Sequence, residues 1–151
     1  MGDRPFAEDL WFGWRAVRSG ARTRFAPDAL VHHAVFERGP LGFVGERLRL
    51  SNFPAVARRI PEFRTRPLHA RVFLSPRSAA LDAAVAGLVI ASARRSAAPL
   101  LAAVPYAWMV GRWARPYRRR APLVAAVGIA ADLVGAAALG YGSARARSLV
   151  L

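Results

Sequence analysis

The residues best suited to chemistry form two adjacent pairs near the start of the chain. Glu8 and Asp9 are an acidic pair, and His32 and His33 are two of the three histidines. A carboxylate whose pKa is tuned by its surroundings can take a proton as a general base. An imidazole can bind a divalent metal or donate to a diphosphate oxygen. Structural roles are the alternatives, because first-turn acids favour the helix macrodipole and a single histidine in a strand is often structural.

A helix is expected to position the acidic pair. Leu10, Trp14 and Val17 recur at helical spacing after it, and Gly20 follows where such a helix would stop. The pattern predicts a helix of about twelve residues with the two acids in its first turn.

Two short strands are expected to position the histidines. Residues 22–25 are predicted to form the first strand, residues 26–28 a turn and residues 29–35 the second strand. Side chains alternate across a strand, so His33 would lie on one face with apolar neighbours and His32 on the other.

These elements carry a series of short motifs in a defined order. The order is Glu8-Asp9, then Gly13-Trp14-Arg15, then Gly20-Ala21-Arg22, then Phe25-Ala26-Pro27-Asp28-Ala29-Leu30-Val31-His32-His33. It resembles the acceptor-side block of bacterial family 2 glycosyltransferases, which reads roughly EDxDLGWR and then GxRxxFxPxAxVxH. That family has the GT-A fold, an α/β sheet that binds a nucleotide sugar, and most members are inverting and metal-dependent.

The resemblance implies a role for several residues. Asp9 stands in the place of the catalytic base, and Glu8 is a neighbour that holds the site. His33 stands in the place of the histidine near the diphosphate and the metal, which would be Mg or Mn in the complete enzyme. Arg15 could steady the departing diphosphate or the acids of its own helix. Trp11 stands where the family usually has a second acid that shapes the acceptor pocket, so we assign it to substrate binding.

Two departures from the family pattern limit the expected activity. The QxxRW motif of processive members is absent, and its nearest counterpart is residues 46–49, which argues against a polysaccharide synthase. The family's donor-binding half, with its DxD motif, precedes the acidic pair and has no counterpart in this sequence. We therefore expect a truncated product, or a fragment whose nucleotide-binding portion is encoded elsewhere, that is inactive alone.

The composition indicates contact with a membrane. Hydrophobic residues make up 54% of the 151 residues although the net charge is +14, which is unusually apolar for a soluble domain with this much charge. All 23 basic residues are arginines, which favour anionic lipid head groups or phosphates. They are spread along the chain without a nucleic-acid-reading motif, so nucleic acid is not an expected partner.

The middle of the chain is expected to connect the two ends. Residues 36–46 are rich in glycine and contain Pro40, which predicts a loop. Residues 47–59 read as one or two short helices, with Ser51 or Asn52 able to cap. Residues 62–78 form a basic, proline-containing linker suited to a membrane surface.

Three apolar runs follow, at residues 79–93, 97–111 and 121–141. The first two are too short to span a core of about 30 Å alone, and could form a shallow hairpin, a re-entrant pair or two marginal spans. The third would be about 31 Å long as a helix, with Asp132 as its one charge. Ala131 and Gly135, four residues apart in this run, predict a small-residue face for close packing against another helix. Arginines flank it on both sides, so a crossing and a position along the surface are both open.

The sequence thus predicts an α+β fragment: a short helix and two short strands from the acceptor side of a GT-A domain, then a mainly α-helical membrane-associated region. The expected divisions are residues 1–60 for the glycosyltransferase piece, 61–78 for the linker and 79–151 for the apolar helical region. The expected function is inverting transfer from a nucleotide sugar to a lipid-linked or glycan acceptor, at the cell membrane with the catalytic part cytoplasmic. The alternative is a small basic membrane protein without catalysis.

Overall fold

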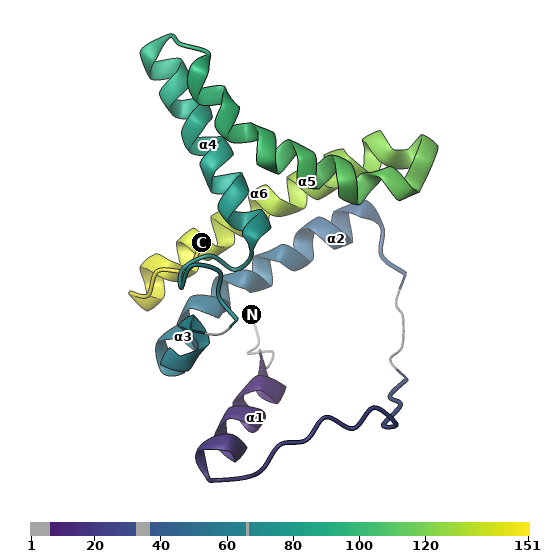
Figure 1. The fold of residues 1–151 in the computed structure, drawn as a ribbon, viewed down its shortest axis with the longest axis vertical. Helices are drawn as coiled ribbons and strands as arrows, with labels where there is room; N and C mark the ends of the chain where they lie inside the picture. The colour runs from purple at the N-terminus through teal and green to yellow at the C-terminus, as the bar shows by residue number, and fades with distance from the viewer. Residues whose placement is uncertain (1–6, 33–36, 66) are drawn as a thin grey trace. The chain divides into compact units, whose positions relative to one another are not determined.

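A computed structural model describes residues 7–32, 37–65 and 67–151 (Figure 1). The chain forms two compact units, Met1–Arg38 and Gly39–Leu151. The described residues contain helices and no strand, and their one β pairing is an isolated bridge between His69 and Phe73. The α+β prediction is therefore wrong, and the described chain is all-α.

The first unit contains the predicted helix, α1 (Glu8–Arg18). Its first turn holds the two acids and its last turn holds Arg15 and Arg18, so the charges complement the macrodipole at both ends. Gly20 follows with φ of +85°, a conformation that glycine adopts without strain. The predicted start and end of this helix are confirmed.

The two predicted strands are not formed. Residues 21–26 and 29–32 have no regular structure, and residues 33–35 of the second strand lie outside the described residues. The predicted turn is present, since the Ala29 N–H donates to the Ala26 carbonyl at 3.1 Å. A strand also needs a partner for its backbone groups, and two short strands are marginal without a third. Alternation was therefore insufficient to predict strands here.

The second unit is a series of short and long helices. They are α2 (Pro40–Glu46), η1 (Arg47–Asn52), α3 (Phe53–Arg59), η2 (Pro61–Arg64), α4 (Pro76–Arg94), η3 (Ala98–Ala103), α5 (Val104–Ala114), η4 (Arg115–Arg120) and α6 (Ala121–Ala146). All of these except η1 carry a proline at the first or second position. Proline suits a first turn, where its missing N–H would have no helical acceptor.

This use of proline explains why the loop predicted at residues 36–46 is wrong. Pro40 begins α2, which runs to Glu46 and packs against α6. Only residues 37–39 of the described part of this segment are irregular. Packing against α6 outweighs the low helix propensity of the two glycines inside α2.

The short helices predicted at residues 47–59 are confirmed as η1 and α3. Asn52 does not cap through its side chain: its amide donates back to the Arg49 carbonyl at 3.3 Å.

Residues 61–75 fold against the end of the chain. The Leu151 N–H donates to the Val72 carbonyl at 2.8 Å. The Arg64 guanidinium donates to the Leu149 carbonyl at 2.8 Å and to the Ser148 hydroxyl at 2.7 Å. Phe63 and Leu68 are buried in the same region. These long-range hydrogen bonds join η2 and the segment that precedes α4 to the residues that follow α6.

The apolar runs form two helical pairs within this unit. The teal α4 lies beside η3, and α6 returns alongside α5 after the reversal at η4 (Figure 1). Arg118, with φ of 51° and ψ of −115°, interrupts the helical geometry at that reversal. By length and composition, the helical run Ala98–Ala146 could cross a membrane, with a mean hydropathy of 2.0 in its most apolar window. The reversal divides this run into two arms.

The small residues of α6 allow a close approach to η1. A Cβ added at Gly142 would lie 2.1 Å from the Ser51 carbonyl oxygen, and one at Gly135 would lie 3.2 Å from Leu50 Cδ1. Ala131 on the same helix is buried. The small-residue face expected on this helix therefore does pack against another helix, namely η1.

Candidate functional site

The structure places four of the predicted site residues on α1. Glu8 and Asp9 are exposed in the first turn, Trp11 is half-buried and Arg15 is exposed. The Asp9 Oδ1 atom accepts a hydrogen bond from the Leu10 N–H at 2.8 Å. The carboxylates of this pair are thus open to solvent.

Helical geometry separates Asp9 from the other three. At about 100° per residue, Glu8, Trp11 and Arg15 share one face of α1, whereas Asp9 lies about 100° around the helix from Glu8. His33, the predicted metal ligand, lies outside the described residues. Within the residues that are described, no three His, Asp or Glu side chains come together as metal ligands.

A second polar site lies in the other unit, between α4, α5 and α6. The Arg77 Nε and Nη2 atoms lie 2.8 Å and 2.7 Å from Asp132 Oδ2. The Tyr106 hydroxyl donates to the same oxygen at 2.8 Å. The Arg77 and Asp132 side chains keep only 27% and 20% of their exposure, so most of this ion pair is removed from water.

Local structure holds Arg77 in place. Ser75 and Ser78 form a reciprocal capping box at the start of α4, which directs the first turn that contains Arg77. The guanidinium carbon lies 5.0 Å from the centroid of the Trp113 ring, close enough for a cation–π interaction. A Cβ at Gly128 would lie 2.5 Å from that ring, so the absence of a side chain there makes room for Trp113.

A cavity of about 340 Å³ opens beside the ion pair. Arg47 and Phe43 line it from η1 and α2, and the Arg47 guanidinium lies 5.0 Å from the Phe43 ring centroid. Its other walls are mostly apolar and include Leu50, Leu81 and Leu139. The arrangement combines two guanidinium groups and one carboxylate with apolar walls.

Asp82 on α4 is a carboxylate in a different environment. Its Oδ2 atom is buried and has no hydrogen-bond partner among the described residues. Burial raises the pKa of Asp82 above its ordinary value because the charged form is less well solvated there.

Sequence reasoning placed chemistry at α1 and found only part of the second site. Asp132 was identifiable as a lone acid in an apolar run, and such an acid is expected to face a partner or water. Its pairing is now defined, but the sequence contained no signal that selected Arg77 from 23 arginines. Arg47, Tyr106 and Trp113 belong to this site only through tertiary contacts.

Comparisons of the chain with protein-family models, with curated proteins and with solved structures gave no match.

Proposed function

We propose that the chain is the membrane-associated part of a family 2-like glycosyltransferase. The complete enzyme would transfer a sugar, with inversion, from a nucleotide-sugar donor to a lipid-linked or cell-envelope acceptor, and this chain alone would be inactive. The observation that carries this proposal is the ordered series of motifs from Glu8 to His33. The form of α1 supports it, because the helix begins at the acidic pair, presents both carboxylates to solvent and is followed by Gly20.

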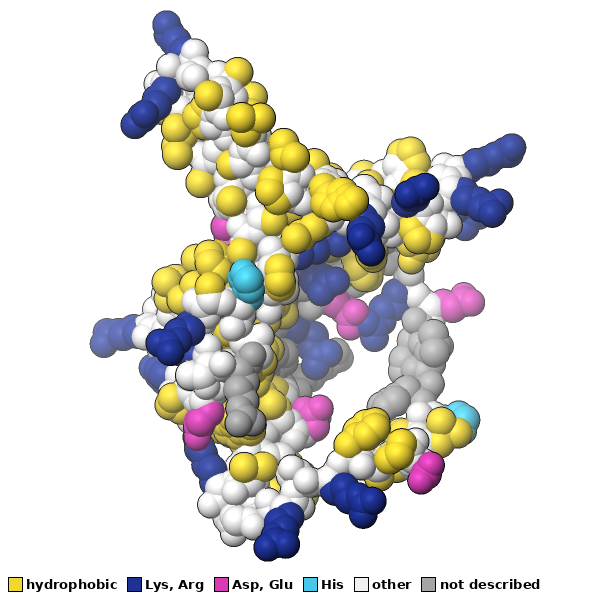
Figure 2. Space-filling view, viewed as in Figure 1, with side chains coloured by type: hydrophobic (Ala, Val, Ile, Leu, Met, Phe, Trp, Pro, Cys, Tyr) yellow, Lys and Arg dark blue, Asp and Glu magenta, His cyan; other side chains and the backbone are white. Residues whose placement is uncertain are grey.

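The surface of the second unit supports attachment to the cell membrane. Large apolar side chains are exposed along α4, η3 and α5, including Val89 at 63% and Leu101 at 72% exposure (Figure 2). Contiguous apolar surface of this kind marks an interaction site for a membrane or another protein. Arginines lie at the end of α4, at residues 94–95, and in η4, at residues 118–120.

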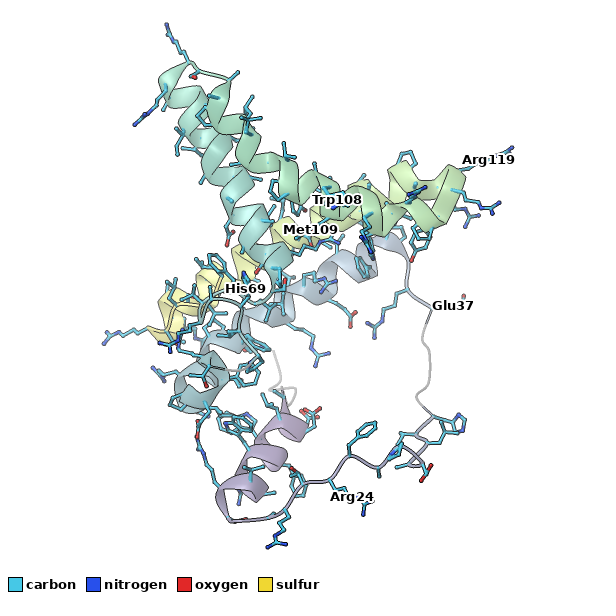
Figure 3. All side chains as sticks on the ribbon, in the orientation of Figure 1. Arg24, Glu37, His69, Trp108, Met109 and Arg119 are labelled. Atoms are coloured by element: carbon cyan, nitrogen blue, oxygen red, sulfur yellow. The ribbon has the colours of Figure 1, made fainter. Side chains whose placement is uncertain are left out.

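The aromatic residues of α5 fit the same interpretation. Trp108 lies on α5, and Arg119 points outward at the neighbouring reversal (Figure 3). Trp108 is 57% exposed, and the Arg112 guanidinium lies 6.0 Å from its ring centroid. Tryptophan beside arginine is typical of the boundary between hydrocarbon and head groups. We also propose that α1, which carries the predicted catalytic residues, lies on the cytoplasmic side of this membrane.

In the complete enzyme, Asp9 would take the proton from the acceptor hydroxyl as that oxygen attacks the anomeric carbon. Glu8 would hold the site, and Trp11 would contact the acceptor. Arg15 would offset charge on the departing diphosphate. His33 would contribute to the Mg or Mn site that the family resemblance implies.

The test begins with the DNA upstream of the Met1 codon, which should encode an in-frame α/β sequence with an acidic DxD-type motif. In the complete enzyme, made from the upstream donor-binding half and this chain, Asp9→Asn should lower kcat by about 10²–10⁴-fold. The affinity for the donor should stay within about twofold of that of the unsubstituted enzyme. Asp28→Asn, a matched change in the turn, should leave kcat unchanged. Absence of such an upstream sequence would reject the glycosyltransferase, and full turnover by Asp9→Asn would reject Asp9 as the base.

The second candidate is a basic membrane protein without catalysis. The observation in its favour is that, among residues 7–32, 37–65 and 67–151, the buried ones and the Arg77–Asp132 pair all lie within Gly39–Leu151, so membrane attachment would need nothing from α1. This candidate predicts that no nucleotide sugar binds the complete gene product. Donor binding measured by calorimetry separates the two functions.

A further inference from the structure

We propose that the cavity beside the Arg77–Asp132 pair binds the phosphate head group of an anionic lipid. Arg47 and Arg77 would be the phosphate ligands. The site is separate from α1 and requires no sugar transfer. It rests on the proposed membrane attachment only for the way in which a lipid reaches it.

The charges around the cavity favour an anion. Arg47 and Arg77 line the cavity with Asp132, so two positive charges face one negative charge. Asp132 accepts from Nε and Nη2 of Arg77, which leaves the Nη1 donors of Arg77 outside that pairing. Arg47 makes no ion pair with a carboxylate of the described residues, and its recorded partner is the Phe43 ring. Guanidinium groups bind phosphate oxygens through paired, charge-assisted hydrogen bonds.

The position of Arg77 is fixed before any ligand arrives. Tyr106 holds the same Asp132 oxygen, and the Trp113 ring lies against the guanidinium. A donor that is already ordered loses little conformational entropy when it binds, which favours affinity.

The walls of the cavity favour a lipid over a free anion. Leu50, Leu81, Leu139 and Trp113 supply an apolar lining. A volume of about 340 Å³ lies at the lower end of the range for ligand pockets, which is about 300–1,000 Å³. That space suits a phosphate group and the first part of its apolar chains.

The elements that form the cavity also supply apolar surface outside it. Leu41 of α2 is 88% exposed, and Ile129 and Leu133 of α6 are exposed on the helix that carries Asp132. A lipid that contacts these side chains would have its chains against apolar surface while its head group lay between the arginines.

Binding is tested with the full chain in a neutral detergent, using short-chain dihexanoyl phosphatidic acid as the probe and calorimetry as the readout. Arg47→Gln should weaken binding by about tenfold or more, because it removes charge-assisted hydrogen bonds to phosphate. Arg47→Lys should bind with intermediate affinity. Arg49→Gln is the matched control, since it removes the same charge from the same helix at a residue that does not line the cavity, and it should bind within about twofold of wild type.

Two further ligands test what the cavity recognises. Inorganic phosphate tests whether a lipid is required, and dihexanoyl phosphatidylcholine tests whether an anionic head group is required. Each should bind at least about tenfold more weakly than phosphatidic acid. Equal affinity for inorganic phosphate would overturn the assignment to a lipid, and equal affinity for phosphatidylcholine would overturn the requirement for an anion. An equal loss in Arg47→Gln and Arg49→Gln would overturn the site, with circular dichroism confirming that both variants are folded.

Flotation with vesicles of phosphatidylcholine and phosphatidic acid separates this inference from membrane attachment. Vesicle binding without saturable binding of the short-chain lipid would overturn the cavity site and leave attachment intact. Short-chain lipid binding without vesicle flotation would support the cavity site and overturn attachment.

Discussion

In Met1–Arg38 none of the described residues is buried, whereas Gly39–Leu151 contains all the buried side chains of the described chain. The motifs that resemble a sugar-transfer block lie in the first unit, and the tightly packed helices lie in the second. Residue types at a given spacing therefore located candidate chemistry, but they did not locate the interactions that stabilise the fold.

The charges of the two units differ in the same way. Glu8, Asp9 and Arg15 are exposed, so water screens their interactions and each contributes little to stability. Arg77 and Asp132 are mostly buried and satisfy each other. Removing one partner from such a pair leaves an uncompensated charge, which costs more than the pair contributes.

If stability resides in the second unit, Gly142→Ala should have the largest effect. The new Cβ would lie 2.1 Å from the Ser51 backbone oxygen, so α6 and η1 would have to separate. We expect a loss of about 3 kcal/mol or more in the free energy of unfolding in detergent. Gly140→Ala is the control on the same helix, because its added Cβ would meet nothing within 4 Å apart from its chain neighbours and the nearby backbone of α6. It should stabilise by about 0.5–1 kcal/mol, and an equal loss in both variants would contradict close packing at Gly142.

Breaking the ion pair should have the next largest effect. Arg77→Met leaves Asp132 without its cation, and we expect a loss of about 2–3 kcal/mol, below the value for a fully buried pair because both side chains keep some exposure. The double variant Arg77→Met with Asp132→Leu should recover most of that loss. Chemical unfolding of the single and double variants measures this coupling, and simple additivity would show that the two residues do not stabilise each other.

Asp82→Asn should have a smaller effect that depends on pH. Burial raises the pKa of the Asp82 carboxyl, so the folded state holds its proton more tightly than the unfolded state. Burial of the charged carboxylate lowers the free energy of unfolding. This loss is fully present above the raised pKa, and it disappears as the pH falls from the raised pKa toward the ordinary pKa of the carboxyl. Asp82→Asn should therefore stabilise at pH 7, by less than about 1 kcal/mol because the group is partly exposed. Melting curves at several pH values should show this gain shrinking in acid; a gain independent of pH would rule out the carboxylate as its cause.

Removing residues 1–38 should have the smallest effect. Since no described residue of that unit is buried, the remaining chain should unfold within about 0.5 kcal/mol of the full chain. Equilibrium unfolding of both chains provides the measurement. A larger loss would show that the first unit contributes to the packing of the second.

Local patterns in the sequence determined the features that depend on neighbouring residues. The spacing of Leu10, Trp14 and Val17 and the position of Gly20 predicted α1, because a helix is built from hydrogen bonds four residues apart. The small residues Ala131 and Gly135 predicted a close-packed face on α6, because small side chains let the backbone of another helix approach closely.

Tertiary structure decided the features that depend on distant partners. Residues 22–25 and 29–32 form no strand because strands need paired backbone groups, which alternation cannot supply. Packing against α6 made α2 a helix despite its glycines. The sequence indicated that Asp132 needs a partner, but it did not indicate which one. The folding of α4, α5 and α6 brought Arg77 and Tyr106 to its carboxylate. Many arginines have the right chemistry, and only the tertiary structure decides which of them has the right position.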